Sequence, residues 1–314
     1  MRWLLICILL LWVSMAYAGV IFQDNYDSYG TLNCYSPTPS GYSGWVTPHS
    51  DTYQSTLHYS GEISSPGRGG SGKSLKLWRH NGSWALDYTG YLEKEFNWST
   101  EKYKELYFRY YIKWPHGLQT GDSPGTKLNR AWITTDGNQG IPNIDLILTN
   151  GLGDSSEIDF VAYTGGNTTS FYTDPVSTFS LNDGNWHSLE FHIKLPTQGQ
   201  ADGVFGVFVD GVAKRLHYYN TQGQDAWTTS ATGYEYRSYP ADNAGDNWYF
   251  YSALTPAIGN TGNSSVPYTV SPDQWTAMEF DDYVISTSYI GPVTSSTRKG
   301  FLEGKFSEGS LILP

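Results

Sequence analysis

One stretch of the chain, ELYFRYYIKW at positions 105–114, carries the side chains best suited to chemistry. Side chains alternate between the two faces of a β-strand, so Tyr107, Arg109, Tyr111 and Lys113 fall on one face and apolar residues on the other. A cation can neutralise a substrate carboxylate, and a tyrosine can transfer a proton when its surroundings tune its pKa. This face therefore suits proton transfer beside a carboxylate. The solvated outer face of a sheet would show the same alternation, and both interpretations stay open.

A second strand offers a candidate general base. His192 and Glu190 share the polar face of a strand predicted over 188–195. A histidine within reach of a carboxylate can accept a proton near neutral pH. A histidine on a strand surface is the alternative interpretation.

Aromatic residues are abundant: they make up 16% of the chain, with 25 Tyr and 12 Trp. Flat rings with polar tips suit sugar rings, which offer apolar C–H faces and many hydroxyls. Because β-sheets are rich in aromatic residues anyway, this composition favours a glycan ligand only slightly. Trp132 and Trp227 are the candidates for stacking on a sugar.

Strands must position these side chains, because every amphipathic window has a period of two residues and none has the period of a helix. The stretch 186–216 is the clearest case, with strict alternation in its first strand and a buried, largely apolar second strand. Asp210-Gly211 supplies the positive φ angles of a two-residue hairpin turn. The predicted strands are 73–78, 90–96, 105–114, 144–149, 157–163, 188–195, 204–209, 212–216, 249–253 and 276–286.

Many short strands separated by turn residues indicate a two-sheet sandwich. We expect one domain over 19–292, since no linker or change of composition interrupts it, and a polar tail over 293–314. Long loops at 35–72, 115–142 and 218–246 are expected to rim a binding groove.

The first eighteen residues have the features of a secretory signal peptide: Arg2, an apolar run from 3 to 13, and Ala16-Tyr17-Ala18 before the cleavage point. We expect a secreted protein, extracellular or periplasmic, whose mature chain keeps Cys34 as its single cysteine. Disulfide bonds are then not expected to stabilise the fold.

The net charge of −11 and the absence of any Lys/Arg run argue against nucleic acid and anionic membranes as partners. No contact with a membrane is expected once the signal peptide is removed. A polysaccharide is the expected partner.

The pattern W-H followed by G-x-x-x-V-x-V-D-G, within 186–211, resembles the core hairpin of the concanavalin A-like superfamily. The resemblance implies an all-β, concanavalin A-like jelly-roll sandwich of two antiparallel sheets. FQDNYD at 22–27 and EFDDYV at 279–284 resemble the opening and closing strands of secreted jelly rolls, which pair side by side.

Calcium often binds in that superfamily where the carboxylates of these two strands meet. The resemblance thus implies a structural Ca²⁺ held by hard oxygen ligands. The alternative is that these acids cap turns and strand ends. The candidate ligands are Asp24, Asp27, Asp281 and Asp282.

GTKLNR at 125–130 resembles the GGKLPG-like segment of alginate and glucuronan lyases, with matches at Gly125, Lys127 and Leu128. The resemblance implies a secreted polysaccharide lyase, of the alginate, glucuronan or heparin lyase type, that cleaves a uronate-containing glycan by β-elimination. The Q-I-H and Y-F-K-x-G-x-Y motifs of jelly-roll alginate lyases have no counterpart, and residues 248–252 read WYFYS.

On the lyase interpretation, Arg109 and Lys127 neutralise the carboxylate, while Tyr111 and His192 transfer protons. The expected substrate-binding residues are Tyr107, Lys113, Arg130, Trp132, Glu190 and Trp227.

Two other functions stay open. A non-catalytic glycan-binding or extracellular-matrix protein would use the same groove and aromatic residues. EIDF at 157–160 resembles the start of the catalytic strand of laminarinase-type hydrolases, but Val161 and Ala162 stand where the acid/base glutamate should be. A degenerate hydrolase is therefore the weaker alternative.

Overall fold

The structure is a computed structural model, and it describes part of the chain. The described residues are 19–27, 52–53, 56–57, 61–80, 90–97, 99–114, 126–134, 143–150, 156–164, 167–173, 181, 183–195, 203–214, 216–219, 225–228, 234–236, 249–260 and 275–293. They form strands and turns without a helix, and so include no helix able to cross a membrane. The predicted signal peptide, Cys34 and the tail beyond Val293 lie outside them.

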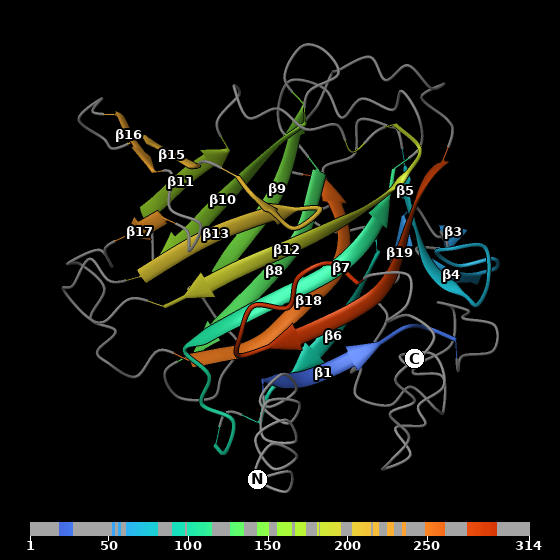
Figure 1. Ribbon diagram of the computed structural model, residues 1–314, viewed down its shortest axis with the longest axis horizontal. Coiled ribbons are helices and arrows are strands. Elements are labelled where there is room, and N and C mark those ends of the chain that lie inside the picture. Colours follow the sequence, from blue (N-terminus) through green and yellow to red (C-terminus); the bar gives the residue numbers. More distant parts are fainter. Residues whose placement is uncertain are drawn as a thin grey trace, which may run out of the picture.

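The first sheet has nine strands in the order β14-β13-β12-β7-β19-β5-β4, with β1 also paired to β19 and β17 to β13 (Figure 1). All these pairs are antiparallel. The strands are β1 (Val20–Asp24), β4 (Gly61–Ser64), β5 (Ser74–His80), β7 (Glu105–Lys113), β12 (Trp186–Lys194), β13 (Gly203–Val209), β14 (Val212–Ala213), β17 (Tyr234–Tyr236) and β19 (Trp275–Ser286).

The second sheet has eight antiparallel strands in the order β16-β15-β11-β10-β9-β8-β18-β6. A separate pair is formed by β2 (Thr52–Tyr53) and β3 (Thr56–Leu57). The strands of the eight-stranded sheet are β6 (Gly90–Glu95), β8 (Thr126–Thr134), β9 (Asn143–Asn150), β10 (Ser156–Thr164), β11 (Asn167–Thr173), β15 (Leu216–Tyr219), β16 (Asp225–Thr228) and β18 (Tyr249–Asn260).

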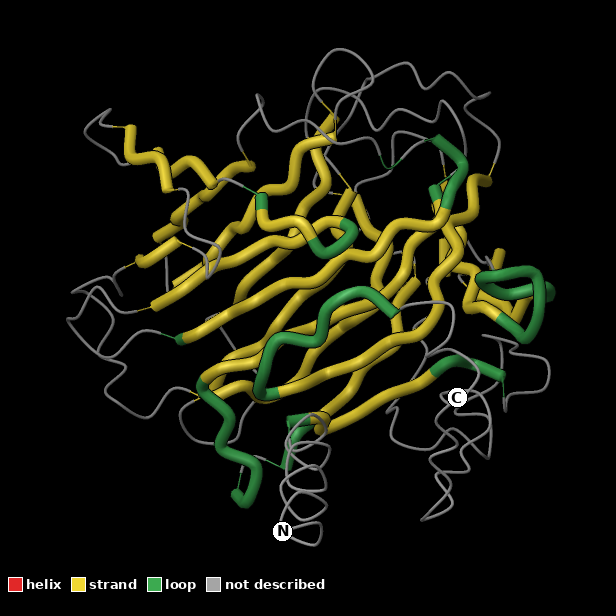
Figure 2. Tube along the Cα trace, viewed as in Figure 1, coloured by secondary structure: helices red, strands yellow, loops and turns green. Residues whose placement is uncertain are grey.

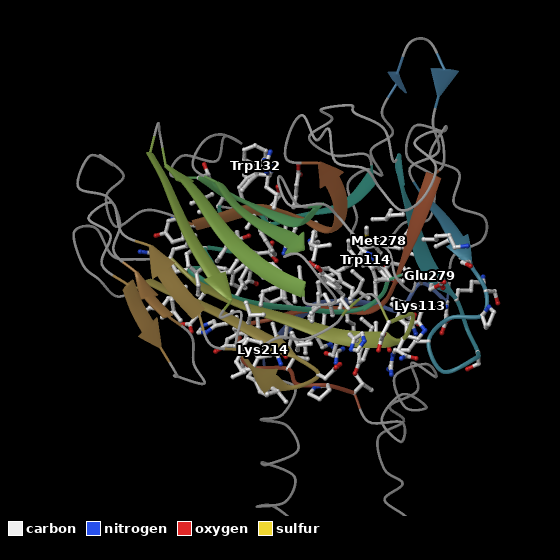
Figure 3. All side chains as sticks on the ribbon, turned by 90° about the horizontal axis from the view of Figure 1, so that it is seen from above. Lys113, Trp114, Trp132, Lys214, Met278 and Glu279 are labelled. Atoms are coloured by element: carbon white, nitrogen blue, oxygen red, sulfur yellow. The ribbon has the colours of Figure 1, made fainter. Side chains whose placement is uncertain are left out.

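The two sheets face each other and enclose the core. Their strands run broadly along one diagonal, as in aligned sandwiches (Figure 2). Seen from above, the core side chains fill the space between the layers (Figure 3). Phe108 of β7 packs edge-on against Phe250 of β18, with the ring centroids 5.9 Å apart, so the core joins both sheets. The predicted all-β jelly-roll sandwich of two antiparallel sheets is confirmed.

The alternation along β12 and β13 is as predicted. Phe191, Ile193, Val207 and Val209 are all buried. Both turn residues between β13 and β14 have positive φ, 52° at Asp210 and 78° at Gly211, as a two-residue hairpin requires.

The predicted pairing of the first and last strands is also confirmed. β1 lies antiparallel to β19, with Asp24 opposite Tyr283. β19 is long enough to pair with β5 through its first half and with β1 through its second half. Its register on β7 shifts between Asp281 and Val284, where Asp282 has a φ of 49°.

The prediction of three long loops was wrong in part, because each contains strands: 35–72 includes β2, β3 and β4, 218–246 includes β16, β17 and the end of β15, and 115–142 includes β8. A bulge between Lys127 and Asn129 shifts the phase of the strand, so that the buried apolar residues are Leu128, Ala131 and Ile133. That spacing lacks the period of two from which strands are recognised. The predicted 212–216 strand was also wrong, because β14 belongs to one sheet and β15 to the other.

Candidate functional site

The residues predicted for the site divide between the two sheets. On β7 and β12 of the nine-stranded sheet lie Tyr107, Arg109, Tyr111, Lys113, Glu190 and His192. On β8 and β16 of the eight-stranded sheet lie Lys127, Arg130, Trp132 and Trp227. Because the sheets are separate layers, the structure does not bring these residues together in one site.

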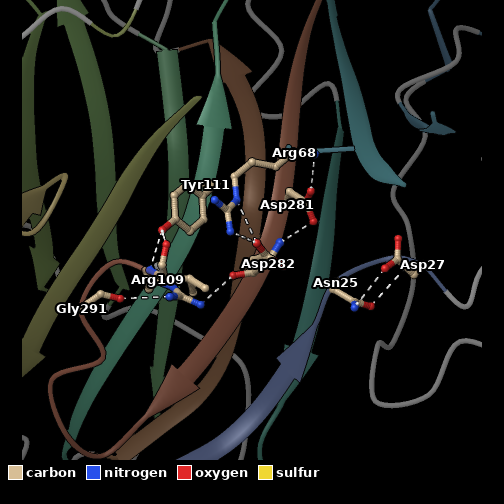
Figure 4. A network of polar contacts seen from close by, with 9 residues as sticks. Asn25, Asp27, Arg68, Arg109, Tyr111, Asp281, Asp282 and Gly291 are labelled. Carbon is tan, nitrogen blue, oxygen red and sulfur yellow. Dashed lines mark hydrogen bonds and ion pairs between the residues drawn. The ribbon is translucent and has the colours of Figure 1, made fainter. Parts of the chain in front are cut away.

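On the nine-stranded sheet, part of the face turned away from the core is covered by residues 287–293, which we call the strap. Arg109 is 1% exposed beneath the strap. Its two terminal nitrogens donate hydrogen bonds to the carbonyl oxygens of Gly291 at 3.0 Å and of Asp282 at 3.2 Å (Figure 4). Burial lowers the pKa of Arg109, and the negative charge of Asp282 opposes that shift. The bond to Gly291 attaches the strap to β7, and the bond to Asp282 joins β7 to β19.

Glu190 also holds the strap. Its two carboxylate oxygens accept hydrogen bonds from the backbone amides of Ile290 at 2.7 Å and Gly291 at 2.8 Å. Burial raises the pKa of Glu190, although these bonds and the nearby Arg109 favour the charged form. The Gly291 carbonyl of the strap is thus hydrogen-bonded to Arg109 of β7, and the Ile290 and Gly291 amides to Glu190 of β12.

Tyr111 makes the third attachment. Its hydroxyl accepts a hydrogen bond from the amide of Val293 at 2.6 Å and lies 3.3 Å from the carbonyl oxygen of the same residue. The guanidinium of Arg68 lies over its ring, 3.8 Å from the centroid. Arg68 is itself held by Asp282, so Tyr111 belongs to a network that joins β7, β19, the strap and the turn before β5 (Figure 4).

His192 pairs with Glu105 rather than with Glu190. Its Nε2 lies 2.7 Å from Glu105 Oε1, and its ring stacks on Tyr107 with centroids 4.1 Å apart. Burial, followed by the charges of Glu105 and Glu190, raises the pKa of Tyr107 to about 12, which makes it a weak proton donor.

Lys113 forms an ion pair at 3.2 Å with Glu279 of β19. All six residues that were predicted for the site and lie on the nine-stranded sheet therefore contact other residues of the protein. A catalytic or substrate-binding role for them stays a prediction.

The four candidate calcium ligands bind backbone amides and an arginine. Asp24 Oδ1 accepts the amide of Tyr26 at 2.8 Å, and Asp27 Oδ1 that of Lys73 at 2.5 Å. Asp281 Oδ2 accepts the amide of Arg68 at 2.7 Å.

Asp282 Oδ2 accepts hydrogen bonds from the Arg68 guanidinium at 2.6 and 2.9 Å. Asp282 Oδ1 is buried and has no hydrogen-bond partner among the described residues. In the described part of the chain, no three acidic, histidine or cysteine groups are placed to hold one metal. The donor set therefore does not fit a Ca²⁺ ion as it stands, and calcium stays a prediction.

The eight-stranded sheet places a different set of residues in one row. The strand register pairs Lys127 with Ile147, Ile147 with Asp159, Asp159 with Tyr172, Tyr172 with His217, and His217 with Trp227. We call this line across β8, β9, β10, β11, β15 and β16 the catalytic-type row; its members with ionisable or aromatic side chains are Lys127, Asp159, Tyr172, His217 and Trp227. Residues directly opposite in an antiparallel pair are neighbours on one face of the sheet.

A second row lies beside it. Arg130 is opposite Asp145, and Trp132 is opposite Asn143. Ala131 and Ile133 are in the core, so the alternation puts Arg130 and Trp132 on the face turned away from the core. The Arg130 guanidinium lies 4.9 Å from the centroid of the Trp132 ring. Figure 3 shows Trp132 on the side of the eight-stranded sheet away from the core.

The register thus places two cations, a tyrosine, a histidine and two tryptophans on separate strands of one sheet. These are the groups that β-elimination beside a uronate carboxylate requires. Lys127, Arg130, Trp132 and Trp227 were predicted from the sequence. Tyr172 and His217 were missed, because β11 and β15 contain no apolar run and only the register of four strand pairs places them in line with Lys127.

No protein-family model and no curated protein matches the chain. Similar solved structures include an alginate lyase, with 14% identity and a TM-score of 0.48 over 84% of this chain and 95% of the other. They also include the endo-β-1,4-glucuronan lyase of the fungus Trichoderma reesei, with 12% identity and a TM-score of 0.47 over 86% and 96%. A marine alginate lyase from Aplysia kurodai shows 14% identity and a TM-score of 0.42 over 72% and 86%.

Proposed function

We propose that this chain is a secreted polysaccharide lyase-like protein that cleaves a uronate-containing glycan by β-elimination on its eight-stranded sheet. The observation that carries the proposal is the catalytic-type row, which aligns Lys127, Tyr172 and His217 across one sheet. The roles that the sequence suggested for Arg109, Tyr111 and His192 are taken in this proposal by Arg130, Tyr172 and His217. The signal-like residues 1–18 support export.

The proposed reaction divides among these residues. Lys127 and Arg130 neutralise the uronate carboxylate, which stabilises the negative charge that develops when the adjacent carbon loses its proton. His217 accepts that proton, the electron pair forms the carbon–carbon double bond, and Tyr172 gives a proton to the departing glycosidic oxygen.

The strand register sets the spacing of these residues. Tyr172 and His217 are direct partners on neighbouring strands, so they can act on the two sides of one bond. Lys127 is three strands away from Tyr172, roughly 14 Å at a strand spacing of about 4.8 Å. Ile147 of β9 and Asp159 of β10 lie between them in the row.

A non-catalytic glycan-binding protein is the second candidate. The Arg130–Trp132 stack favours it, because a half-buried tryptophan held by a cation is a rigid surface for the apolar face of a sugar ring. In that case the same sheet binds polysaccharide without cleaving it.

The test is to incubate the mature protein with a panel of polyuronates and to follow the ultraviolet absorbance of the unsaturated uronate product. The proposal predicts that the product forms, and that Tyr172→Phe and Lys127→Ala abolish it while glycan binding remains. Each change removes a group that interacts most strongly with charge or protons in the transition state, so turnover falls by more than affinity does.

Lys76→Ala, in β5 of the other sheet, is the matched control for the loss of a lysine and should retain turnover. Binding of polyuronate without any unsaturated product would favour the binding protein over the lyase.

A further inference from the structure

We infer that Lys102, Lys104 and Tyr249 form a separate subsite for an anionic sugar residue, at the end of the eight-stranded sheet beyond Trp132. We call these three residues the basic edge. The inference rests on the proposed function for its ligand class, a uronate polymer, but not on catalysis.

In the basic edge, the ammonium groups of two lysines lie near the aromatic ring of one tyrosine. The ammonium of Lys102 lies 5.5 Å and that of Lys104 5.2 Å from the centroid of the Tyr249 ring. Both lysines are exposed, and the tyrosine is half-buried. The ring attracts both cations through its negative face, and so holds two like charges close together.

The backbone behind these lysines is fixed. The amide of Phe250 donates to the carbonyl of Tyr103 at 3.0 Å, and the amide of Leu195 donates to the carbonyl of Lys104 at 2.8 Å. Between the lysines, Tyr103 turns inward and packs edge-on against Phe96 of the core, with centroids 5.6 Å apart. The two ammonium groups are therefore presented from a segment attached to both β18 and the end of β12.

Nearby acids do not neutralise Lys102. The closest in sequence, Glu101, uses Oε2 to accept the amide of Asn97 at 2.6 Å and so caps the preceding turn. Lys102 has no carboxylate partner among the described residues. In a chain with a net charge of −11, two lysines gathered on one tyrosine form a local site for an anion.

The register connects the basic edge to the proposed site. Tyr249 is paired with Thr134, and Ser252 with Trp132, across β18 and β8. Phe250 and Ile133, the pair between them, point into the core. Tyr249 thus lies on the same face as Trp132 and Arg130. A polymer that passes over Trp132 can reach the basic edge with another of its carboxylates.

The experiment measures the affinity of the mature protein for a long polyuronate and for the same polymer after reduction of its carboxyl groups. Lys102→Ala/Lys104→Ala should weaken binding of the carboxylated polymer about 3- to 30-fold at low salt, as two exposed charge contacts predict. The loss should shrink as salt increases, and the carboxyl-reduced polymer should bind both proteins alike. Lys76→Ala/Lys194→Ala, which removes two lysines from the nine-stranded sheet, is the matched control.

Unchanged affinity of the Lys102→Ala/Lys104→Ala variant, an equal loss with the reduced polymer, or no binding of polyuronate by the wild-type protein would each overturn the inference. A wild-type protein that binds polyuronate but forms no unsaturated product overturns the lyase proposal and leaves the basic edge standing. The two failures are therefore distinguishable.

Discussion

The attachment of the strap gives the sharpest stability prediction. Tyr111 is 5% exposed. Tyr111→Phe removes its hydroxyl, which accepts a hydrogen bond from the Val293 amide at 2.6 Å and lies 3.3 Å from the Val293 carbonyl oxygen. The short bond contributes about 1 kcal/mol net, and the longer contact adds less. We expect the free energy of unfolding to fall by about 1–2 kcal/mol, since the ring and its packing under Arg68 remain.

For a domain of this size that loss lowers Tm by about 2–6 °C, which thermal denaturation followed by circular dichroism resolves. Tyr107→Phe is the matched control, because it changes the neighbouring tyrosine on the same face and its hydroxyl makes no hydrogen bond among the described residues. Its Tm should stay within about 1 °C of the wild type. Equal Tm values for the wild type and Tyr111→Phe, or equal losses in the two variants, would refute the reasoning.

Two further predictions concern buried and titrating charges. Arg68→Ala leaves the Asp282 carboxylate, which is 1% exposed, without its cation, and should cost about 3–5 kcal/mol in chemical denaturation; a loss below about 1 kcal/mol would show that the pair is not effectively buried. The hydrogen bond to Asp210, followed by that to Asp183, raises the pKa of His187 in the folded state. Its contribution is therefore fully present below the unfolded pKa of about 6.5 and lost as pH rises through the folded pKa. A Tm series from about pH 5 to pH 9 should show the advantage of the wild type over His187→Gln shrinking with pH, and a constant difference would contradict this assignment.

The strands with clear alternation could be predicted from sequence. In β7, β12 and β13 the apolar core residues, such as Phe108, Phe191 and Val207, recur at every second position and specify the inward face, although much of the other face is buried as well. The Asp210-Gly211 turn was predictable because both of its residues tolerate positive φ. β8 was not, because the bulge at Leu128 breaks the pattern.

The candidate site was less predictable, for two physical reasons. The polar face of β7 looks like a binding surface in sequence, but the strap that covers it lies 182 residues further along the chain. Local pattern carries no information on such a long-range contact. The alignment of Lys127 with Tyr172 and His217 depends on the register of successive strand pairs, and a slip of one residue in any of them would remove it.

The central claim is that the reactive groups lie on the eight-stranded sheet rather than beneath the strap. The direct test is the rate of formation of unsaturated uronate by Tyr172→Phe and by Tyr111→Phe, both measured well below the lower Tm. The account predicts that Tyr172→Phe loses turnover and keeps the Tm of the wild type, whereas Tyr111→Phe keeps turnover and loses Tm. Loss of turnover in Tyr111→Phe with full activity in Tyr172→Phe would contradict it.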